Sequence, residues 1–379
     1  MAATQPPGIH VDYSLDRQYF IPISRWIGFS YGAFSSLVLH PLIIYLIIFK
    51  SPFMKRDYKI GSVLLQISHF LADLWMDVLY QLYSLQPLPG FLCNGLLCSA
   101  GISGSTLLTA LALFIINICA VYLLLIMRLH QCVLGSNSIL QLSQRKQVIV
   151  GCVLYVFLMT NVIGFWLSAG DSATKEVDIE RFHLEWTREF PALQWFGRDG
   201  AINNLSLEMI WLGVSVCLVF PLMPLMYADI VRRMARERVR KSLTTLHRMR
   251  LIKRGCLTKL NSIQRISVRA THVLIIRFAS SACFFILPLI VLFTGMVSLL
   301  DWLPPSAHAV VRFTALCAFY VYSFFCSSAF LLMNKLHLDF VLGLFGCGKT
   351  MTIPRLQISV APSVDARNST DGGSHRSVV

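Results

Sequence analysis

Long apolar runs separated by short polar segments cover most of the chain. Seven of these runs hold about 20 residues or more, which is enough for a helix to cross a hydrocarbon layer roughly 30 Å thick. The pattern therefore predicts an all-α membrane protein, built as a bundle of seven transmembrane helices. The predicted spans are approximately Trp26–Phe49, Ile60–Leu85, Leu97–Met127, Gln147–Ser168, Ser206–Ile230, Leu274–Leu300 and Phe313–Met333.

These spans divide the chain into three parts. We expect an extracellular N-terminal segment at residues 1–25, a seven-helix domain at 26–333 with a long basic loop at 231–273, and a largely disordered cytoplasmic tail at 334–379. The first 24 residues show neither the basic-then-apolar pattern nor the cleavage site of a secretory signal. The first span is therefore expected to direct insertion into the membrane.

Charge supports the membrane interpretation and predicts an orientation. Only 14% of the residues are charged, against roughly 25% in an average soluble domain. With the N-terminus outside and the C-terminus in the cytoplasm, 26 of the 33 Lys and Arg fall on the cytoplasmic side, as such loops prefer. The net charge of +14 then reflects topology and attraction to anionic lipid, and predicts no nucleic-acid partner.

The stretch GLFGCGKT, at 343–350, matches the phosphate-binding loop of nucleotide-hydrolysing enzymes. Such a loop must follow a strand and open a helix, whereas this one follows a membrane span and precedes only a polar tail. We therefore predict a turn after a short helix at Lys335–Leu344, no enzymatic activity, and no cofactor or metal. Cys347 remains a candidate for palmitoylation.

The chain contains 11 cysteines, most of them within the predicted spans. Cys93 has no evident partner in the long outer loop, and its spacing to Cys98 matches no metal-binding pattern. We interpret the cysteines as mainly small apolar packing residues.

Ionisable residues inside a span are costly and are often functional. The second span, LLQISHFLADLWMDVLYQLY, carries His69, Asp73 and Asp77 at intervals of four residues, so all three share one helix face. Further polar and aromatic residues extend this face in steps of three: Gln66, Tyr80 and Tyr83.

Two interpretations of this face stay open. In the structural one, polar groups of neighbouring helices, such as Asn117 and Ser323, satisfy Asp73, and His69 forms an interhelical hydrogen bond. In the functional one, the face acts as a switch or contacts a ligand. Asp77 is the stronger ligand candidate, because it lies about 6 Å further outward than Asp73.

Other residues near the outer ends of the spans are candidates for ligand contact: Trp166, Glu208, Trp211 and Tyr320. For the tryptophans, anchoring at the membrane interface is the alternative. Pro221 and Pro288 lie inside spans, where proline kinks a helix, and kinked helices suit a bundle that changes shape. Asn204 begins a glycosylation sequon close to the membrane, and the C-terminal Val379 is a candidate ligand for a PDZ domain.

The most basic segment, Arg232–Arg269, holds 13 Lys and Arg against one acidic residue, Glu237. Its first half lacks Pro and Gly, which predicts a cytoplasmic extension of the fifth helix. Attraction to anionic lipid is one role for such a surface. Docking of a cytosolic signalling protein is the other.

The stretch YLIIFKSPFMKRDYKIGSVLLQISHFLADL, followed by LQPLPGFLCNGLL, resembles the nematode serpentine chemoreceptors of class H and class I. The resemblance is specific over Tyr45–Leu97 and extends to the whole topology. It implies a G-protein-coupled receptor in the plasma membrane, with the sensory cilium as a candidate site, that binds a small extracellular ligand. Asp73 matches the second-span Asp of the family. The residues expected to face the heterotrimeric G protein are Arg128, Arg232, Arg233 and Arg236.

A transporter or channel is the competing hypothesis, with His69, Asp73 and Asp77 as a proton or cation path. Many transporters consist of two related halves, and the chain shows no such internal repeat. We therefore favour the receptor.

Overall fold

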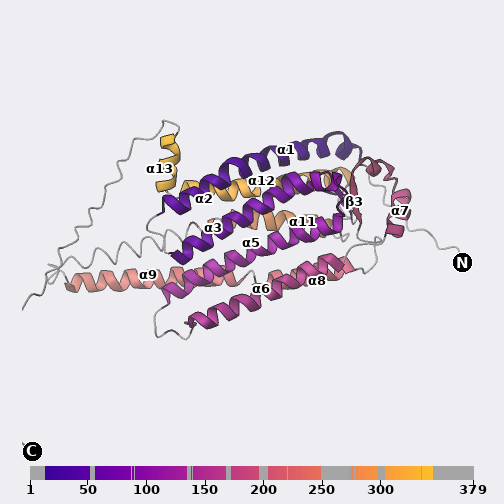
Figure 1. The fold of residues 1–379 in the computed structure, drawn as a ribbon. Coiled ribbons are helices and arrows are strands. Elements are labelled where there is room, and N and C mark those ends of the chain that lie inside the picture. Colours follow the sequence, from indigo (N-terminus) through magenta and orange to yellow (C-terminus); the bar gives the residue numbers. More distant parts are fainter. Residues whose placement is uncertain are drawn as a thin grey trace, which may run out of the picture. The chain divides into compact units, whose positions relative to one another are not determined.

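The computed structural model contains helices that run alongside one another (Figure 1). Within the described residues, six helices are long and apolar enough to cross a membrane: Asp16–Phe49, Arg56–Tyr80, Gly104–Val133, Gln144–Leu167, Ile210–Arg233 and Ser306–Met333. The structure describes residues 13–51, 56–86, 88, 90–134, 138, 140–167, 172–195, 204–219, 221–248, 273, 275–276, 279–280, 282–296, 304–333 and 335–344. By its contacts the chain divides into Met1–Leu338 and Asp339–Val379.

The sixth predicted span, Leu274–Leu300, is described only in part. Its described portion contains a π-helical turn at Ala282–Ile286 and α11 at Leu287–Met296, and α11 packs against α12. The predicted sites at Cys347 and Val379, and most of the GLFGCGKT stretch, lie outside the described residues.

The structure confirms six of the seven predicted spans and shifts several of their ends. The first span comprises α1 (Ile21–Phe34) and α2 (His40–Phe49), joined by a π-helical segment, and the second comprises α3 (Arg56–Asp73) and the π-helical segment that follows it. The next two spans are α5 (Gly104–Val133) and α6 (Gln144–Leu167), with the short α4 (Leu96–Ser99) before them. The remaining helices are α7 (Ser172–Arg181), α8 (Asn204–Val219), α9 (Leu222–Arg248), α12 (Pro305–Met333) and α13 (Lys335–Leu344).

The connection between the second and third spans is longer than the sequence predicted. The second helix ends at Tyr80, because Gln81 adopts a left-handed conformation with φ of 46°. The third begins at Gly104, where the Ser103 side chain accepts a hydrogen bond from the Thr106 amide. The prediction that Tyr83 extends the helix face of Asp77 is therefore wrong, since Tyr83 lies in a strand.

Three prolines follow wide helical turns. Pro22, Pro41 and Pro288 are each the second residue of an α-helical segment that continues a π-helical one. Proline lacks an N–H and its ring crowds the preceding turn, so a wider turn accommodates it without ending the helix. In the fifth span the helix is interrupted instead, since α8 ends at Val219 and α9 begins after Pro221.

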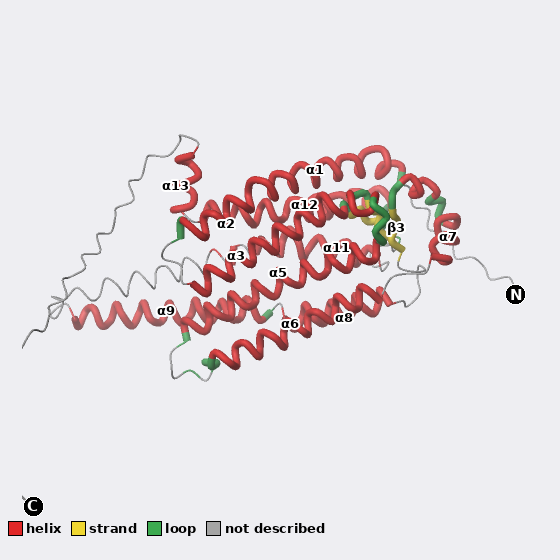
Figure 2. Tube along the Cα trace, in the orientation of Figure 1, coloured by secondary structure: helices red, strands yellow, loops and turns green. Residues whose placement is uncertain are grey.

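A three-stranded antiparallel sheet closes one end of the bundle (Figure 2). It consists of β1 (Leu82–Ser84), β2 (Gly90–Cys93) and β3 (Ala192–Trp195), in that order. Gly90 is required by close packing, because a Cβ there would lie 2.8 Å from the Trp195 ring. The sheet ties the connection between the second and third spans to the one between the fourth and fifth.

A disulfide joins Cys93 at the end of β2 to Cys98 in α4. Their Cα atoms are 6.1 Å apart, within the range that a disulfide requires. The prediction that the cysteines serve mainly as packing residues is wrong for this pair. The turn between them, which contains Gly95, folds the two sulfurs together, and spacing alone did not reveal this.

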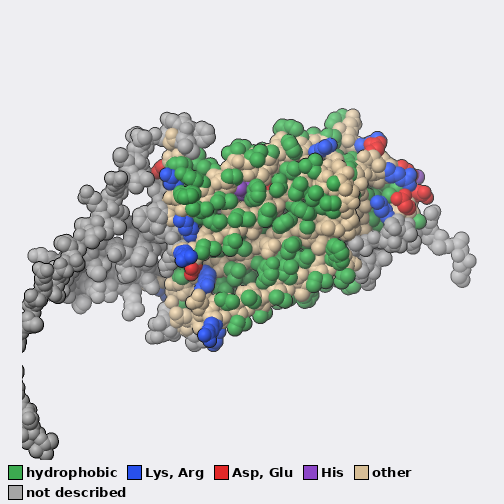
Figure 3. Space-filling view, viewed as in Figure 1, with side chains coloured by type: hydrophobic (Ala, Val, Ile, Leu, Met, Phe, Trp, Pro, Cys, Tyr) green, Lys and Arg blue, Asp and Glu red, His purple; other side chains and the backbone are tan. Residues whose placement is uncertain are grey.

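The two ends of the bundle differ in charge (Figure 3). Apolar side chains cover the visible flank, whereas charged side chains gather toward its ends, as expected for a protein surrounded by lipid. We call the end that carries the sheet and α7 the sheet end. We call the opposite end, where the basic α9 leaves the bundle, the basic end.

At the basic end, α13 packs against the end of the first span. Nε2 of His337 lies 2.9 Å from the Ser51 hydroxyl, and the Phe330 ring lies 5.3 Å from the imidazole. Burial lowers the pKa of His337 to about 4, so the imidazole is neutral at physiological pH. The short helix predicted at Lys335–Leu344 is confirmed.

Candidate functional site

An apolar cavity of about 50 Å³ lies inside the bundle near the sheet end. The sheet forms part of its wall, and α5, α6, α8, α11 and α12 form the rest. The lining residues are Leu82, Phe91, Leu108, Ala112, Ile115, Ile116, Asn161, Phe165, Leu212, Leu292 and Phe319. A site between helices, with apolar walls and few polar groups, is the usual form of a small-molecule pocket.

Asn161 is the polar residue in this lining. Its Nδ2 donates to the Leu158 carbonyl, at 3.1 Å, and to the Ser215 hydroxyl of α8, at 3.2 Å. Its Oδ1 is buried, and has no hydrogen-bond partner among the described residues. Sequence reasoning missed Asn161. The available signal was an amide inside an otherwise apolar span.

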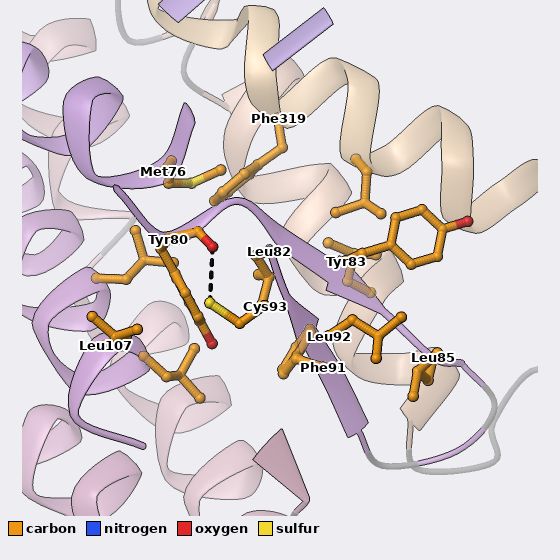
Figure 4. Close-up of a cluster of buried hydrophobic side chains, with 14 of the residues drawn as sticks. Met76, Tyr80, Leu82, Tyr83, Leu85, Phe91, Leu92, Cys93, Leu107 and Phe319 are labelled. Carbon is orange, nitrogen blue, oxygen red and sulfur yellow. Dashed lines mark hydrogen bonds between the residues drawn. The ribbon is translucent and has the colours of Figure 1, made fainter. Parts of the chain in front are cut away.

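The sheet end of the cavity is densely packed (Figure 4). Figure 4 shows Phe319 pointing from α12 toward Met76, and Tyr80 beside Leu107. The Cys93 sulfur lies 2.9 Å from the Tyr80 carbonyl oxygen, so the disulfide rests on the end of the second helix. The disulfide thus ties β2, which carries the cavity residue Phe91, to α4.

The polar residues of the second span lie elsewhere, between this helix, the first span and α12. His40 Nε2 lies 2.8 Å from Asp73 Oδ2, and its Nδ1 lies 2.5 Å from Gln66 Nε2. An amide nitrogen only donates, so Nδ1 accepts, and Nε2 carries the proton directed at Asp73. Gln66 also donates to Ser327, at 3.2 Å.

The structural interpretation had named two other partners for Asp73. Ser323 contacts His40, the partner of Asp73: the Ser323 hydroxyl lies 3.3 Å from Nε2 of His40. Asn117 instead accepts a hydrogen bond from Tyr155, at 3.0 Å. His40 could not be recognised as a partner from the local sequence, because it lies in the first span, far from Asp73 along the chain.

His69 and Asp77 are also buried and do not line the cavity. His69 Nδ1 lies 2.8 Å from the Tyr322 hydroxyl. Asp77 packs directly on the first helix, since a Cβ added at Gly32 would lie 2.2 Å from the Cβ of Asp77. The three residues thus share buried surroundings while each contacts a different group.

The remaining ligand candidates take up different positions. Tyr320 is buried and donates to the Leu82 carbonyl of β1. Trp166 is 54% exposed on the flank, as expected for an interfacial anchor. Trp211 donates to the Thr160 hydroxyl, at 2.8 Å. Glu208 is 5% exposed and packs against α6.

A buried ion pair joins the first and last spans at the sheet end. Arg312 of α12 donates through Nε, at 3.1 Å, and through Nη2 to the Asp16 carboxylate, and both side chains are at most 1% exposed. Arg312 also donates to the Gln86 carbonyl, and Tyr83 donates to Asp16. The guanidinium stacks over the Tyr13 ring, 5.1 Å from its centroid.

The candidate G-protein-facing arginines lie at the basic end. Arg128 donates to Gln147 of α6, at 3.0 Å, and Arg233 donates to Asp229, at 2.7 Å. Arg232 and Arg236 are exposed on α9. His130 of α5 also reaches Asp229, with its Nε2 2.9 Å from Oδ2, and so joins α5 to α9.

A family model described as "Serpentine type 7TM GPCR chemoreceptor Sri" matches residues 18–300, about three quarters of the chain. The crystal structure of squid rhodopsin is similar with a TM-score of 0.43 and 14% identity, over 89% of this chain and 87% of that chain. No curated protein matches the chain. The family match confirms the resemblance drawn from the sequence.

Proposed function

Because the chain belongs to the serpentine Sri family of seven-transmembrane chemoreceptors, we propose that it is a chemosensory receptor of the plasma membrane. The sheet end faces outward, the cavity takes up a small ligand, and the basic end activates a heterotrimeric G protein. The orientation rests on the distribution of Lys and Arg along the chain.

The observation that carries the proposal is the apolar cavity. Five helices and the sheet converge on it, so an occupant contacts the third to the seventh spans at once. On α11, Leu292 lines the cavity four residues beyond Pro288, which follows a π-helical turn. A ligand that contacts Leu292 is well placed to bias the packing of α11, provided that its affinity differs between two states of the bundle.

The polar cluster of the second span supports a switch role rather than ligand contact. His40 of the first span bonds to Asp73 and Gln66 of the second, and Gln66 bonds to Ser327 of α12, so buried hydrogen bonds link three spans away from the cavity lining. Buried polar networks have few alternative arrangements, because each unsatisfied group is costly. We therefore assign this cluster to holding the resting packing of the helices.

At the basic end, α9 offers a surface for the G protein. The helix extends the fifth span to Arg248 and carries exposed Arg232 and Arg236. An exposed cationic helix at this end suits an acidic surface on a cytosolic partner.

The test is to fill the cavity. Cells that express the receptor and a promiscuous G protein are exposed to a panel of small volatile alcohols, ketones, aldehydes and amines, with calcium as the readout. We expect at least one response, and its loss in Ala112→Phe with surface expression retained. The control, Val153→Phe, adds bulk at a site that is 62% exposed on the flank and should respond normally. A response that survives in Ala112→Phe contradicts the proposal.

A further inference from the structure

Glu208 is a buried carboxylate beside the cavity. It is 5% exposed, and its Oε1 has no hydrogen-bond partner among the described residues. A Cβ added at Gly164 of α6 would lie 1.5 Å from Glu208 Oε2. The carboxylate therefore fills the space that a larger residue at position 164 would occupy, and α6 accommodates it by having no side chain there.

A carboxyl group in such surroundings is either protonated and neutral or paired with a cation. Burying an isolated charge costs far more than burying an apolar group, and a buried charge is normally paired. Two other buried carboxylates follow this rule, since Asp16 pairs with Arg312 and Asp73 lies beside His40. Within the described part of the chain, no Lys, Arg or His forms an ion pair with Glu208.

A second acceptor lies along the same interface. Asn161, with its unpartnered Oδ1, precedes Gly164 by about one helical turn. Its amide contacts Ser215, which is two turns from Glu208 on α8. Both acceptor oxygens therefore belong to the contact between α6 and α8.

Glu208 and Gly164 do not line the cavity themselves, but residues next to them on α6 and α8 do. Asn161 lines the cavity, as does Phe165, the neighbour of Gly164. Leu212, one helical turn from Glu208, lines it from α8. A molecule whose body fills the cavity can therefore place a polar end group beside Glu208.

We propose that the ligand is a protonated primary amine with an apolar body. Its ammonium group pairs with Glu208 and donates a further hydrogen bond to Asn161 Oδ1, and its body occupies the apolar cavity. An ammonium has three donors and no acceptor, which suits two acceptors without a donor. A neutral alcohol leaves the carboxylate uncompensated, and a carboxylic acid repels it. This inference rests on the cavity being the ligand site, as proposed above.

The test uses the purified full-length receptor in lipid nanodiscs. Binding of n-butylamine, n-hexylamine and n-octylamine, and of the matching n-alkanols, is measured through the shift in the midpoint of thermal unfolding. We expect one or more of the amines to bind the wild type, and Glu208→Gln to weaken that binding roughly ten- to hundredfold, as loss of a charged hydrogen-bond partner predicts. Binding of the alkanols should be the same in both.

Two glycine variants provide a matched pair that leaves Glu208 in place. Gly164→Ala places a methyl group against the carboxylate and should also weaken amine binding. Gly213→Ala makes the same change in α8, where an added Cβ meets nothing within 4 Å, and should bind as the wild type does. Equal amine binding in the wild type, Glu208→Gln and Gly164→Ala would overturn the inference, as would the absence of amine binding to the wild type.

Nucleotide exchange on a G protein, measured in the same nanodiscs, separates this inference from the proposed function. Amine binding that depends on Glu208 but stimulates no exchange supports the amine site and contradicts the signalling role. Exchange stimulated by alkanols, without binding of any amine, supports the receptor and overturns the amine site.

Discussion

The two ends of the bundle use charge in different ways. At the sheet end, Asp16 and Arg312 are at most 1% exposed, and the same end carries a disulfide and a three-stranded sheet. At the basic end, the pair of Asp229 and Arg233 has side chains 31% and 32% exposed, and a single histidine, His130, links it to α5.

This difference assigns different mechanical roles to the two ends. A buried pair with satisfied hydrogen bonds is strongly destabilised when one partner is removed, so the sheet end holds one arrangement. An ion pair with about a third of each side chain exposed contributes roughly 0–1 kcal/mol, little enough for a protein partner to replace it. We therefore propose that the sheet end keeps one arrangement around the proposed ligand site, whereas the basic end rearranges.

The largest expected effect is at the buried pair. Arg312→Leu leaves Asp16 buried without its cation and should destabilise the fold by about 3–5 kcal/mol, seen as loss of surface expression and a lower unfolding midpoint. Arg17→Ala removes an ion pair to Glu189 that is more than half exposed, and should cost less than about 1 kcal/mol. Similar losses in the two variants would contradict the role of Arg312.

Removing the disulfide should have the next largest effect. Cys93→Ser removes the disulfide to Cys98, five residues later in the chain. The chain entropy regained by the unfolded state predicts destabilisation by about 2 kcal/mol. The double variant with Cys98→Ser should resemble the single one, and mild reductant should lower the unfolding midpoint of the wild type alone. Insensitivity of the wild type to reductant would mean that the bond does not stabilise the sheet end.

At the basic end, a smaller change in stability should accompany a larger change in signalling. His130→Ala removes the link from α5 to Asp229 and should cost about 1 kcal/mol. Because this loosens the end proposed to meet the G protein, we expect higher nucleotide exchange without ligand. Cys132→Ala, at an exposed neighbouring position on α5, is the control. Equal basal exchange in the wild type and both variants would count against the assignment.

The smallest effect concerns pH. The pKa of His337 falls from 6.5 to about 4 on burial, so the unfolded chain takes up the proton more readily. Above pH 6.5 the imidazole is neutral in both states, and its burial does not destabilise the fold. As the pH falls from 6.5 toward 4, the unfolded chain binds the proton first, so the free energy of unfolding decreases. Lowering the pH from 7 to 6 should cost roughly 0.7 kcal/mol. The difference in unfolding midpoint between the wild type and His337→Gln, followed against pH, isolates this effect, and a constant difference would refute it.

The sequence predicted helices more successfully than their connections. Apolar runs longer than a bilayer is thick have one main interpretation, so the spans and the extension of α9 followed from the pattern. The turn at Gln81, the strand that carries Tyr83 and the disulfide depend on contacts between distant segments. The predicted helix extended to Tyr83 because no Gly or Pro in the local sequence marked its end at Tyr80.

For the candidate site, the sequence identified single residues but not their partners. Glu208 was a candidate because it lies near the outer end of a span, and the structure adds Gly164, which packs against it. Asp73 was evident, whereas its partner His40 comes from another helix, more than 30 residues earlier. Pairings between helices follow from their packing, which hydropathy does not encode.

The most direct test of this account is amide hydrogen exchange on the receptor in lipid nanodiscs, with and without a nucleotide-free heterotrimeric G protein. Heterotrimers of each major α-subunit class are tried, and the one that binds is used. We predict new protection in α9 and the adjoining end of α5, and no change in β1, β2 and β3. No binding by any heterotrimer, or protection confined to the sheet end, would contradict the account.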